Sequence, residues 1–237
     1  MKANDRLIVA LDVDSEKKAL ALVDKLRNDV RVFKVGLELF SSCGPGILEA
    51  IKERERDIFL DLKFHDIPNT VARAAASVTR LGVFILNVHA LGGYDMMKEA
   101  CGAVKLEAQR LGIERPRVLA VTILTSMDEN GLKKVGIHDT IQKEVVRLAL
   151  IAKDAGADGV VASPSEAKLI RENAGEGFII VTPGVRPAWA AKNDQKRIAT
   201  PAEAVRNGAN FIVVGRPITE AADPVRAAKE IIEEMTI

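Results

Sequence analysis

The chain has 237 residues, of which 48% are hydrophobic, and this length supports one large buried core. Its 34 basic and 33 acidic residues give a formal net charge of +1, and only 4% of its residues are aromatic. The charge balance argues against a broad basic surface for nucleic acid or membranes, and the few aromatic residues argue against base-stacking platforms.

Targeting signals and cysteine pairs are also not predicted. The two cysteines, Cys43 and Cys101, do not have the spacing of metal ligands, so we expect free reduced thiols. The residues after Met1 contain no apolar signal segment, and no apolar stretch approaches the length of a membrane span. We therefore expect a cytoplasmic protein that binds neither membranes nor nucleic acid.

Short apolar runs alternate with amphipathic stretches along the chain, and eight of these runs are typical of strands. In chain order the predicted strands are 7–11, 32–37, 58–62, 84–89, 118–124, 159–162, 178–182 and 211–215. Their nearly continuous hydrophobicity is typical of parallel strands that are buried on both faces. Between these strands lie stretches whose apolar or small residues recur with helical spacing. Three such sets are Ala19, Leu22, Val23 and Leu26; Ala72, Ala75, Ala76 and Thr79; and Val145, Leu148, Ala149 and Ala152.

Eight strand–helix repeats in a chain of this length predict a single-domain (β/α)₈ TIM barrel, an α/β fold that spans residues 1–237. A doubly wound open sheet is the alternative. Its dinucleotide-binding form is disfavoured because no Gly-x-Gly-x-x-Gly follows the first predicted strand. Active sites of TIM barrels lie at the C-terminal ends of the strands, so polar residues at those ends are the site candidates.

The third predicted strand leads into a dense group of charges. Asp61 and Lys63 are two residues apart, so a regular strand would point both side chains to the same face. Asp66 follows at the turn, and Pro68 can begin a helix. A lysine between two carboxylates at the end of a buried strand is costly for stability and is typical of catalytic acids and bases.

Other predicted strands also end in polar residues. The first ends at Asp12, the second carries Lys34, the fourth ends at His89, and the fifth runs into Thr125 and Ser126. Charged and polar groups from several strands would therefore meet at one rim of the barrel. We interpret His89 as a packing group and His138 as a surface residue.

The loops after the seventh and eighth predicted strands are the usual phosphate site of this fold. Gly215 would let the backbone approach an anion, and the Arg216 guanidinium can bind phosphate through two hydrogen bonds. Gln195 can donate a further hydrogen bond. We predict a phosphate site here, with residues 184–196 as a lid and Trp189 as an exposed loop residue.

Over its whole length the sequence resembles the orotidine 5′-phosphate decarboxylase family. The matching segments are Val-Ala-Leu-Asp (9–12), Phe-Lys-Val-Gly (33–36), Asp-Leu-Lys-Phe-His-Asp-Ile-Pro-Asn-Thr (61–70), Asn-Val-His-Ala (87–90), Leu-Thr-Ser-Met (124–127), Thr-Pro-Gly-Val-Arg-Pro (182–187), Asp-Gln-Lys-Arg (194–197) and Val-Gly-Arg-Pro-Ile (214–218). Related sugar-phosphate barrels share the Asp-x-Lys-x-x-Asp core, but its combination with Ile-Pro-Asn-Thr and both phosphate loops is highly specific.

The resemblance implies the step of pyrimidine biosynthesis that converts orotidine 5′-monophosphate to uridine 5′-monophosphate and CO₂, without metal or organic cofactor. It implies that Lys63 protonates ring carbon C6, that Asp61 lies against the leaving carboxylate, and that Lys34 completes the charge array and reaches the ribose. Asp66 and Thr70 match residues that enter the neighbouring subunit's site, so the resemblance also implies a homodimer.

The remaining substrate contacts are implied in the same way. The resemblance assigns Asp12 to a ribose hydroxyl, Thr125 and Ser126 to the pyrimidine, and Arg186, Gln195, Gly215 and Arg216 to the phosphate.

Two other functions stay open at this point. The first is a metal-dependent sugar-phosphate lyase or synthase of the same barrel superfamily, which is disfavoured because Lys34 occupies the position of a glutamate metal ligand in those relatives. The second is a nucleotide-binding protein without catalysis, which the complete set of Asp61, Lys63 and Asp66 makes less favourable. A purely structural salt-bridge network would not account for the matching phosphate loops.

Overall fold

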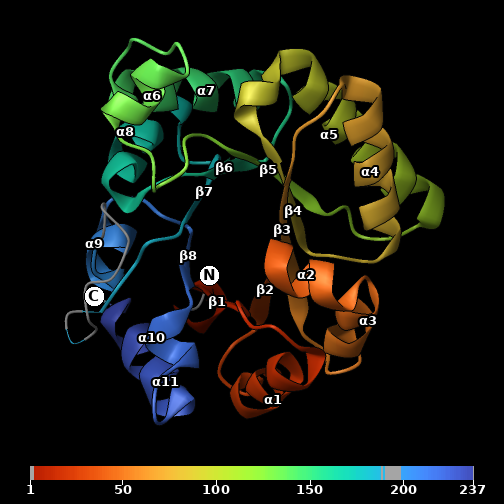
Figure 1. The fold of residues 1–237 in the computed structure, drawn as a ribbon, viewed down its shortest axis with the longest axis vertical. Helices are drawn as coiled ribbons and strands as arrows, with labels where there is room; N and C mark the ends of the chain where they lie inside the picture. Colours follow the sequence, from red (N-terminus) through yellow and green to blue (C-terminus); the bar gives the residue numbers. More distant parts are fainter. Residues whose placement is uncertain (1–2, 188, 190–198, 237) are drawn as a thin grey trace.

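Eight parallel strands form a closed barrel in the computed structural model, which describes residues 3–187, 189 and 199–236. Each strand pairs with the next along the chain, and β8 pairs with β1 to close the barrel. Helices surround the strands on the outside (Figure 1). The predicted TIM barrel is therefore confirmed.

All eight predicted strands are present. They are β1 (Leu7–Ala10), β2 (Val32–Gly36), β3 (Asp57–Phe64), β4 (Ile85–His89), β5 (Arg117–Val121), β6 (Gly159–Val161), β7 (Ile179–Thr182) and β8 (Phe211–Val214). Two ends differ clearly from the prediction. β3 continues to Phe64 because it pairs with β4 again beyond an irregularity. β5 ends at Val121 because both of its neighbours end opposite that residue, β4 at His89 and β6 at Val161.

The helices begin and end at conventional signals. They are α1 (Glu16–Leu26), α2 (Leu37–Cys43), α3 (Gly46–Lys52), α4 (Pro68–Arg80), α5 (Gly93–Leu111), α6 (Glu129–Lys134), α7 (Ile141–Asp154), α8 (Pro164–Ala174), α9 (Pro201–Arg206), α10 (Arg216–Thr219) and α11 (Pro224–Glu234), with short 3₁₀ turns at Ala3–Arg6 and Ala90–Gly92. Pro68 occupies the first turn of α4, as predicted, where its missing N–H has no cost.

The predicted buried face of α7 is confirmed, but that of α4 is rotated. On α4 the buried residues are Val71, Ala75, Val78 and Thr79, whereas Ala72 and Ala76 are half-buried. Because valine buries more apolar area than alanine, the face that carries both valines turns inward.

The core has two parts, one inside the barrel and one between the strands and the helices. The inner part contains large side chains such as Phe59 and Phe211 together with valines and isoleucines. Five of its members also line the cavity described below: Ala10, Phe59, Val121, Val161 and Val213. The packed interior of the barrel thus forms an apolar floor for that cavity.

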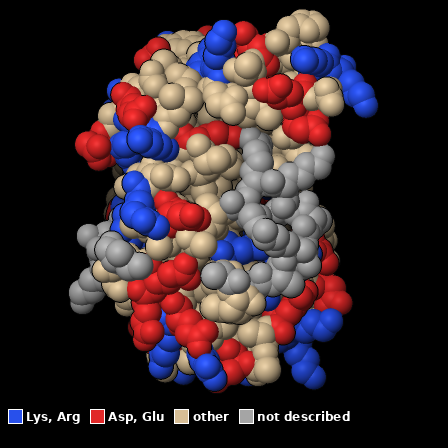
Figure 2. Space-filling view, turned by 90° about the vertical axis from the view of Figure 1, so that its left-hand side faces the viewer, with Lys and Arg blue, Asp and Glu red and all other residues tan. Residues whose placement is uncertain are grey.

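None of the described helices is both long enough and apolar enough to cross a lipid bilayer. Figure 2 shows one flank of the molecule, where acidic and basic side chains are interspersed over the described surface. This mixture agrees with the near-zero net charge of the chain.

A close approach between β6 and β7 generates a stability prediction. A Cβ atom at Gly159 would lie 2.1 Å from the carbonyl oxygen of Ile179, its partner in the ladder. Since this neighbour is backbone, Gly159→Ala would force the strands apart. We expect the free energy of unfolding to fall by about 1–3 kcal/mol or more in urea denaturation.

A second glycine provides the control. Gly102 lies inside α5, is exposed, and has open space where a Cβ would be. Gly102→Ala should raise the free energy of unfolding by about 0.5–1 kcal/mol through helix propensity alone. Equal effects of the two alanines would contradict the close approach at β6.

Candidate active site

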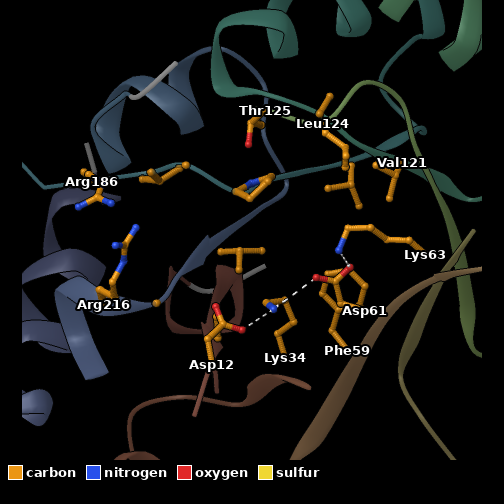
Figure 3. Close-up of a pocket in the computed structure, with 18 of the residues that line it drawn as sticks. Asp12, Lys34, Phe59, Asp61, Lys63, Val121, Leu124, Thr125, Arg186 and Arg216 are labelled. Carbon is orange, nitrogen blue, oxygen red and sulfur yellow. Dashed lines mark hydrogen bonds and ion pairs between the residues drawn. The ribbon is translucent and has the colours of Figure 1, made fainter. Parts of the chain in front are cut away.

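A cavity of about 530 Å³ opens at the C-terminal ends of the strands. Its lining comes from the ends of several strands and from the loops that follow them, as expected for this fold. Figure 3 shows charged side chains of β2 and β3 at one side of the cavity and two arginines, Arg186 and Arg216, at another. The cavity therefore combines an apolar floor with two separate charged regions.

Four side chains of alternating charge form a continuous row, which we call the charge chain: Asp12, Lys34, Asp61 and Lys63. The Lys34 ammonium lies 2.9 Å from Asp12 Oδ1 and 3.3 Å from Asp61 Oδ2. The Lys63 ammonium lies 2.7 Å from the other Asp61 oxygen, Oδ1. The Asp61 carboxylate is thus shared by two ammonium groups, and the sequence-predicted proximity of Asp61 and Lys63 is confirmed.

Burial and charge act in opposite directions on the pKa values in the charge chain. Burial alone would lower the pKa of Lys34, but the carboxylates of Asp61 and Asp12 outweigh it and raise that pKa. Burial would raise the pKa of Asp61, but the charges of Lys34 and Lys63, with hydrogen bonds from Lys63 and Asn87, outweigh it and lower that pKa. Both groups are therefore charged at neutral pH.

A glycine on β2 makes room for the Lys34 ammonium. A Cβ atom at Gly36 would lie 2.9 Å from Lys34 Nζ and 3.4 Å from Asp12 Oδ1. Any larger residue would displace the end of the lysine side chain from its two carboxylates. The Phe-Lys-Val-Gly segment thus supplies both the charge and the space for it.

The end of β3 is irregular where it carries the charges. The pairing with β4 runs from Leu60↔Leu86 directly to Phe64↔Val88, so residues 61–63 of β3 lie opposite one residue of β4, Asn87. Lys63 has a φ of 51°, a left-handed conformation that is unusual for a residue with a side chain. Asp61 and Lys63 share a cavity as predicted, but through this irregularity and not through a regular strand.

Asn87 is the functional candidate that sequence reasoning missed. Its side chain donates to Asp61 Oδ1 at 2.6 Å and accepts from the Lys63 backbone N–H at 2.8 Å. The available signal was a polar residue inside an otherwise apolar predicted strand. Glu38, Ile123 and Glu220 line the cavity as well and were not predicted.

The predicted phosphate end of the cavity brings together Arg186, Gly215 and Arg216. Arg186 is buried, and its backbone N–H donates to the Ala199 carbonyl at 2.9 Å. Gly215 precedes α10 directly, and both it and the first two residues of α10, Arg216 and Pro217, line the cavity. Gln195 and most of the predicted lid at 184–196 lie outside the described residues, whereas Trp189 is exposed, as predicted.

The other predicted substrate contacts have different locations. Thr125 lines the cavity, but Ser126, Asp66 and Thr70 are exposed and do not line it in this chain. Asp66 accepts a hydrogen bond from the Ile67 amide at 2.6 Å instead of joining the charge chain. Of the predicted array of Lys34, Asp61, Lys63 and Asp66, one chain therefore brings three members together, and Asp12 completes the row.

Two histidines lie beside the site without lining the cavity. The rings of His65 and His89 stack with centroids 5.4 Å apart. Burial lowers the pKa of His89, and the nearby charges of His65 and Lys63 lower it further. His138 is exposed, as predicted. Within residues 3–187, 189 and 199–236, no three His, Cys, Asp or Glu side chains are grouped so that they could hold a metal ion.

The closed parallel barrel and the charged cavity at its C-terminal rim define a TIM-barrel enzyme with a site for a small ligand. Comparison with known proteins identifies the enzyme family. Residues 5–231 match the model of the orotidine 5′-phosphate decarboxylase / HUMPS family. The chain therefore belongs to this family.

Individual relatives support the assignment. The orotidine 5′-phosphate decarboxylase of Trichlorobacter lovleyi is 54% identical over 99% of this chain and 96% of its own length. That of Syntrophomonas wolfei is 53% identical over 99% of both chains. The crystal structure of the Lactobacillus acidophilus enzyme of the same name superimposes with a TM-score of 0.87 at 41% identity, covering 98% of this chain and 100% of that one.

The shared carboxylate generates a prediction for the pKa of Lys34. Asp61→Asn removes the strongest influence that raises this pKa but leaves the burial that lowers it. The pKa of Lys34 should therefore fall, as measured by NMR titration of its ¹³C-labelled ε-carbon. Asp12→Asn should cause a smaller fall, and Asp14→Asn on the surface should cause none. An unchanged Lys34 pKa in Asp61→Asn would contradict the charge chain.

Proposed function

We propose that the protein decarboxylates orotidine 5′-monophosphate to uridine 5′-monophosphate in pyrimidine biosynthesis, without a metal or organic cofactor. The observation that carries this proposal is the charge chain above an apolar floor, in the same cavity as two arginines. The names of relatives that are more than 50% identical over the whole chain support it further. A substrate with a reactive anionic ring and a remote phosphate suits these two charged regions.

Lys63 is the group that we assign to the reacting carbon. When the bond between C6 and the carboxylate breaks, its electron pair stays on C6 as a localised carbanion. A fixed ammonium beside that carbon stabilises the developing negative charge, and one of its protons then forms the new C6–H bond. The neutral amine of Lys63 regains a proton from solvent after product release.

Asp61 has two tasks in this proposal. Its ion pair of 2.7 Å holds the Lys63 ammonium in place, and its carboxylate lies against the leaving carboxylate of the substrate. Repulsion between two carboxylates raises the energy of the bound substrate and disappears when neutral CO₂ forms. The second ammonium, Lys34, keeps Asp61 ionised and reaches toward the ribose together with Asp12.

The phosphate end provides binding energy away from the reacting carbon. Arg186, Gly215 and Arg216 bind the phosphate, and Gln195, which lies outside the described residues, is assigned to the same phosphate. Thr125 and Ser126 bind the pyrimidine. Binding energy from these remote contacts holds the pyrimidine ring against the charge chain. The charge chain alone would attract the substrate only weakly, because its charges already compensate one another.

The exposed residues after β3 suggest a shared site in a homodimer. Asp66 and Thr70 are exposed in the single chain, and between them Ile67 is 66% exposed, which is unusual for an isoleucine. Asp66 and Thr70 come only a few residues after the end of β3, the strand that carries Lys63. We propose that Asp66 and Thr70 enter the site of the neighbouring subunit, where Asp66 joins the partner's charge chain.

The geometry of Lys34 argues against the alternative function, a metal-dependent sugar-phosphate lyase or synthase. An ammonium group has no lone pair for a metal ion, and here it is held between the carboxylates of Asp12 and Asp61. A metal at this position would compete with the lysine for the same carboxylate oxygens.

The role of Lys63 leads to a direct prediction. Lys63→Ala should lower the turnover of orotidine 5′-monophosphate by a factor on the order of 10⁴ or more, because it removes both the proton donor and the charge beside C6. Binding of uridine 5′-monophosphate, measured by calorimetry, should persist because the phosphate end is unchanged. Lys98→Ala, at an exposed lysine of α5, is the matched control with wild-type turnover. Turnover near the wild-type value in Lys63→Ala would exclude Lys63 as the acid.

The shared site leads to a second prediction. When Lys63→Ala and Asp66→Asn subunits are mixed, half of the dimers are mixed on random pairing, and each of these has one intact site. Roughly a quarter of wild-type activity should return in a two-fold dimer, although each variant alone is nearly inactive. If no activity returns after mass spectrometry has shown subunit exchange, Asp66 does not act across the interface.

A further inference from the structure

We infer that Asn87 of β4 is a positioning residue, which holds the Lys63 backbone and the Asp61 carboxylate in their reactive arrangement. The inference rests on the proposed roles of Lys63 and Asp61 but concerns a residue that touches neither substrate nor the reacting carbon. Its basis is the irregular pairing of β3 with β4 and the two hydrogen bonds of the Asn87 side chain.

Asn87 lies at a position from which its side chain reaches both groups. The pairs Leu60↔Leu86 and Phe64↔Val88 leave it alone opposite residues 61–63 of β3. In a regular parallel ladder, backbone groups of β4 would bond to those N–H and C=O groups of β3 that point toward it. Here the side chain of Asn87 takes over that task for the Lys63 N–H.

The chemistry of the two contacts determines how the amide is turned. A backbone N–H can only donate, so the oxygen Oδ1 of Asn87 must face Lys63, where the distance is 2.8 Å. The NH₂ group then faces Asp61 Oδ1 at 2.6 Å and must donate to it. Asn87 is only 1% exposed, so water has little access to replace either of these hydrogen bonds.

These two bonds act on the two reactive groups together. The left-handed conformation of Lys63, with φ of 51°, is unfavourable for a residue with a side chain, and its N–H would lose its partner without Asn87. On Asp61, the amide and the Lys63 ammonium bind the same oxygen, Oδ1. Asn87 therefore fixes the direction in which the carboxylate presents itself to Lys63 and to the cavity.

The chain contains a matched asparagine with a purely structural task. Asn210 accepts from the Ile180 backbone N–H at 2.8 Å and from the Arg171 guanidinium at 2.7 Å. Like Asn87, Asn210 uses its side chain in place of a backbone group to accept from the N–H of a strand residue. Asn210, however, directly precedes β8 and so lies at the N-terminal end of the barrel, opposite the cavity. Asn210→Ala, which removes both acceptor contacts, thus serves as the control for the loss of equivalent hydrogen bonds away from the cavity.

The decisive variant is Asn87→Asp, which has nearly the same shape. The introduced carboxylate can still accept from Lys63 N–H but can donate to Asp61 only when it is protonated. Burial and the negative charge of Asp61 raise the pKa of such a carboxyl, so its protonated fraction grows as the pH falls. At pH 8 we expect kcat to fall about a hundredfold with KM changed less than about threefold.

The pH profile distinguishes positioning from mere stability. The other titratable groups near Asn87 are Asp61 and Lys63 on β3, Lys34 on β2 beyond Asp61, and His89 on β4, while its partner on β5 is Leu119. Because the wild-type enzyme contains the same groups, we divide the kcat of the variant by the wild-type kcat at each pH, and this ratio is free of their contribution. The ratio for Asn87→Asp should rise as the pH is lowered from 8 to 6.

Two further variants complete the experiment. Asn87→Ala should lose kcat at every pH, because neither bond can form, whereas Asn210→Ala, which also loses its side-chain hydrogen bonds, should keep the wild-type kcat and pH profile. A kcat within about twofold of wild type in Asn87→Asp, or a ratio that does not change with pH, would overturn the inference. Full activity in Lys63→Ala would instead overturn the proposed function, so the two failures are distinguishable. Thermal melting of each variant at pH 6 and 8 shows that the compared proteins are folded.

Discussion

The site depends on one buried carboxylate, that of Asp61, shared by the ammonium groups of Lys34 and Lys63. Taking these charges out of water is costly, and only short contacts on both carboxylate oxygens compensate for it. The barrel provides those contacts through its register, which places Gly36 of β2 beside Asp61 of β3 and leaves space for the Lys34 ammonium. A small shift of β2 against β3 would leave a charge without its partner.

The other features of the cavity follow from that arrangement. Because the charges already compensate one another, the charge chain offers little net attraction for an anionic substrate. In the proposed function, the two arginines across the cavity provide that attraction, and the packed interior of the barrel forms the apolar floor. The proposed function thus combines electrostatic interactions at the reacting carbon with a phosphate-binding region that is separate from it.

The sequence predicts the barrel well and the site in part, for identifiable reasons. Parallel strands buried on both sides are continuous apolar runs, so all eight were visible. The spacing of Asp61 and Lys63 correctly predicts that they lie close together, but not the irregular, left-handed backbone that brings them together, because a shift in register depends on the neighbouring strand. Asn87 acquires its importance from the same shift. The position of Asp66 outside its own cavity reflects the turn after β3, and its proposed task needs a second chain.

In the proposed function, this charge chain removes a carboxylate without help from a metal. The most direct measurement follows orotidine 5′-monophosphate by its ultraviolet absorbance, together with the CO₂ released, after exhaustive chelation and with no metal added. The account predicts undiminished turnover, with one uridine 5′-monophosphate and one CO₂ for each substrate consumed. Loss of turnover that magnesium restores, or tight binding of uridine 5′-monophosphate with no CO₂ released from the substrate, would contradict it.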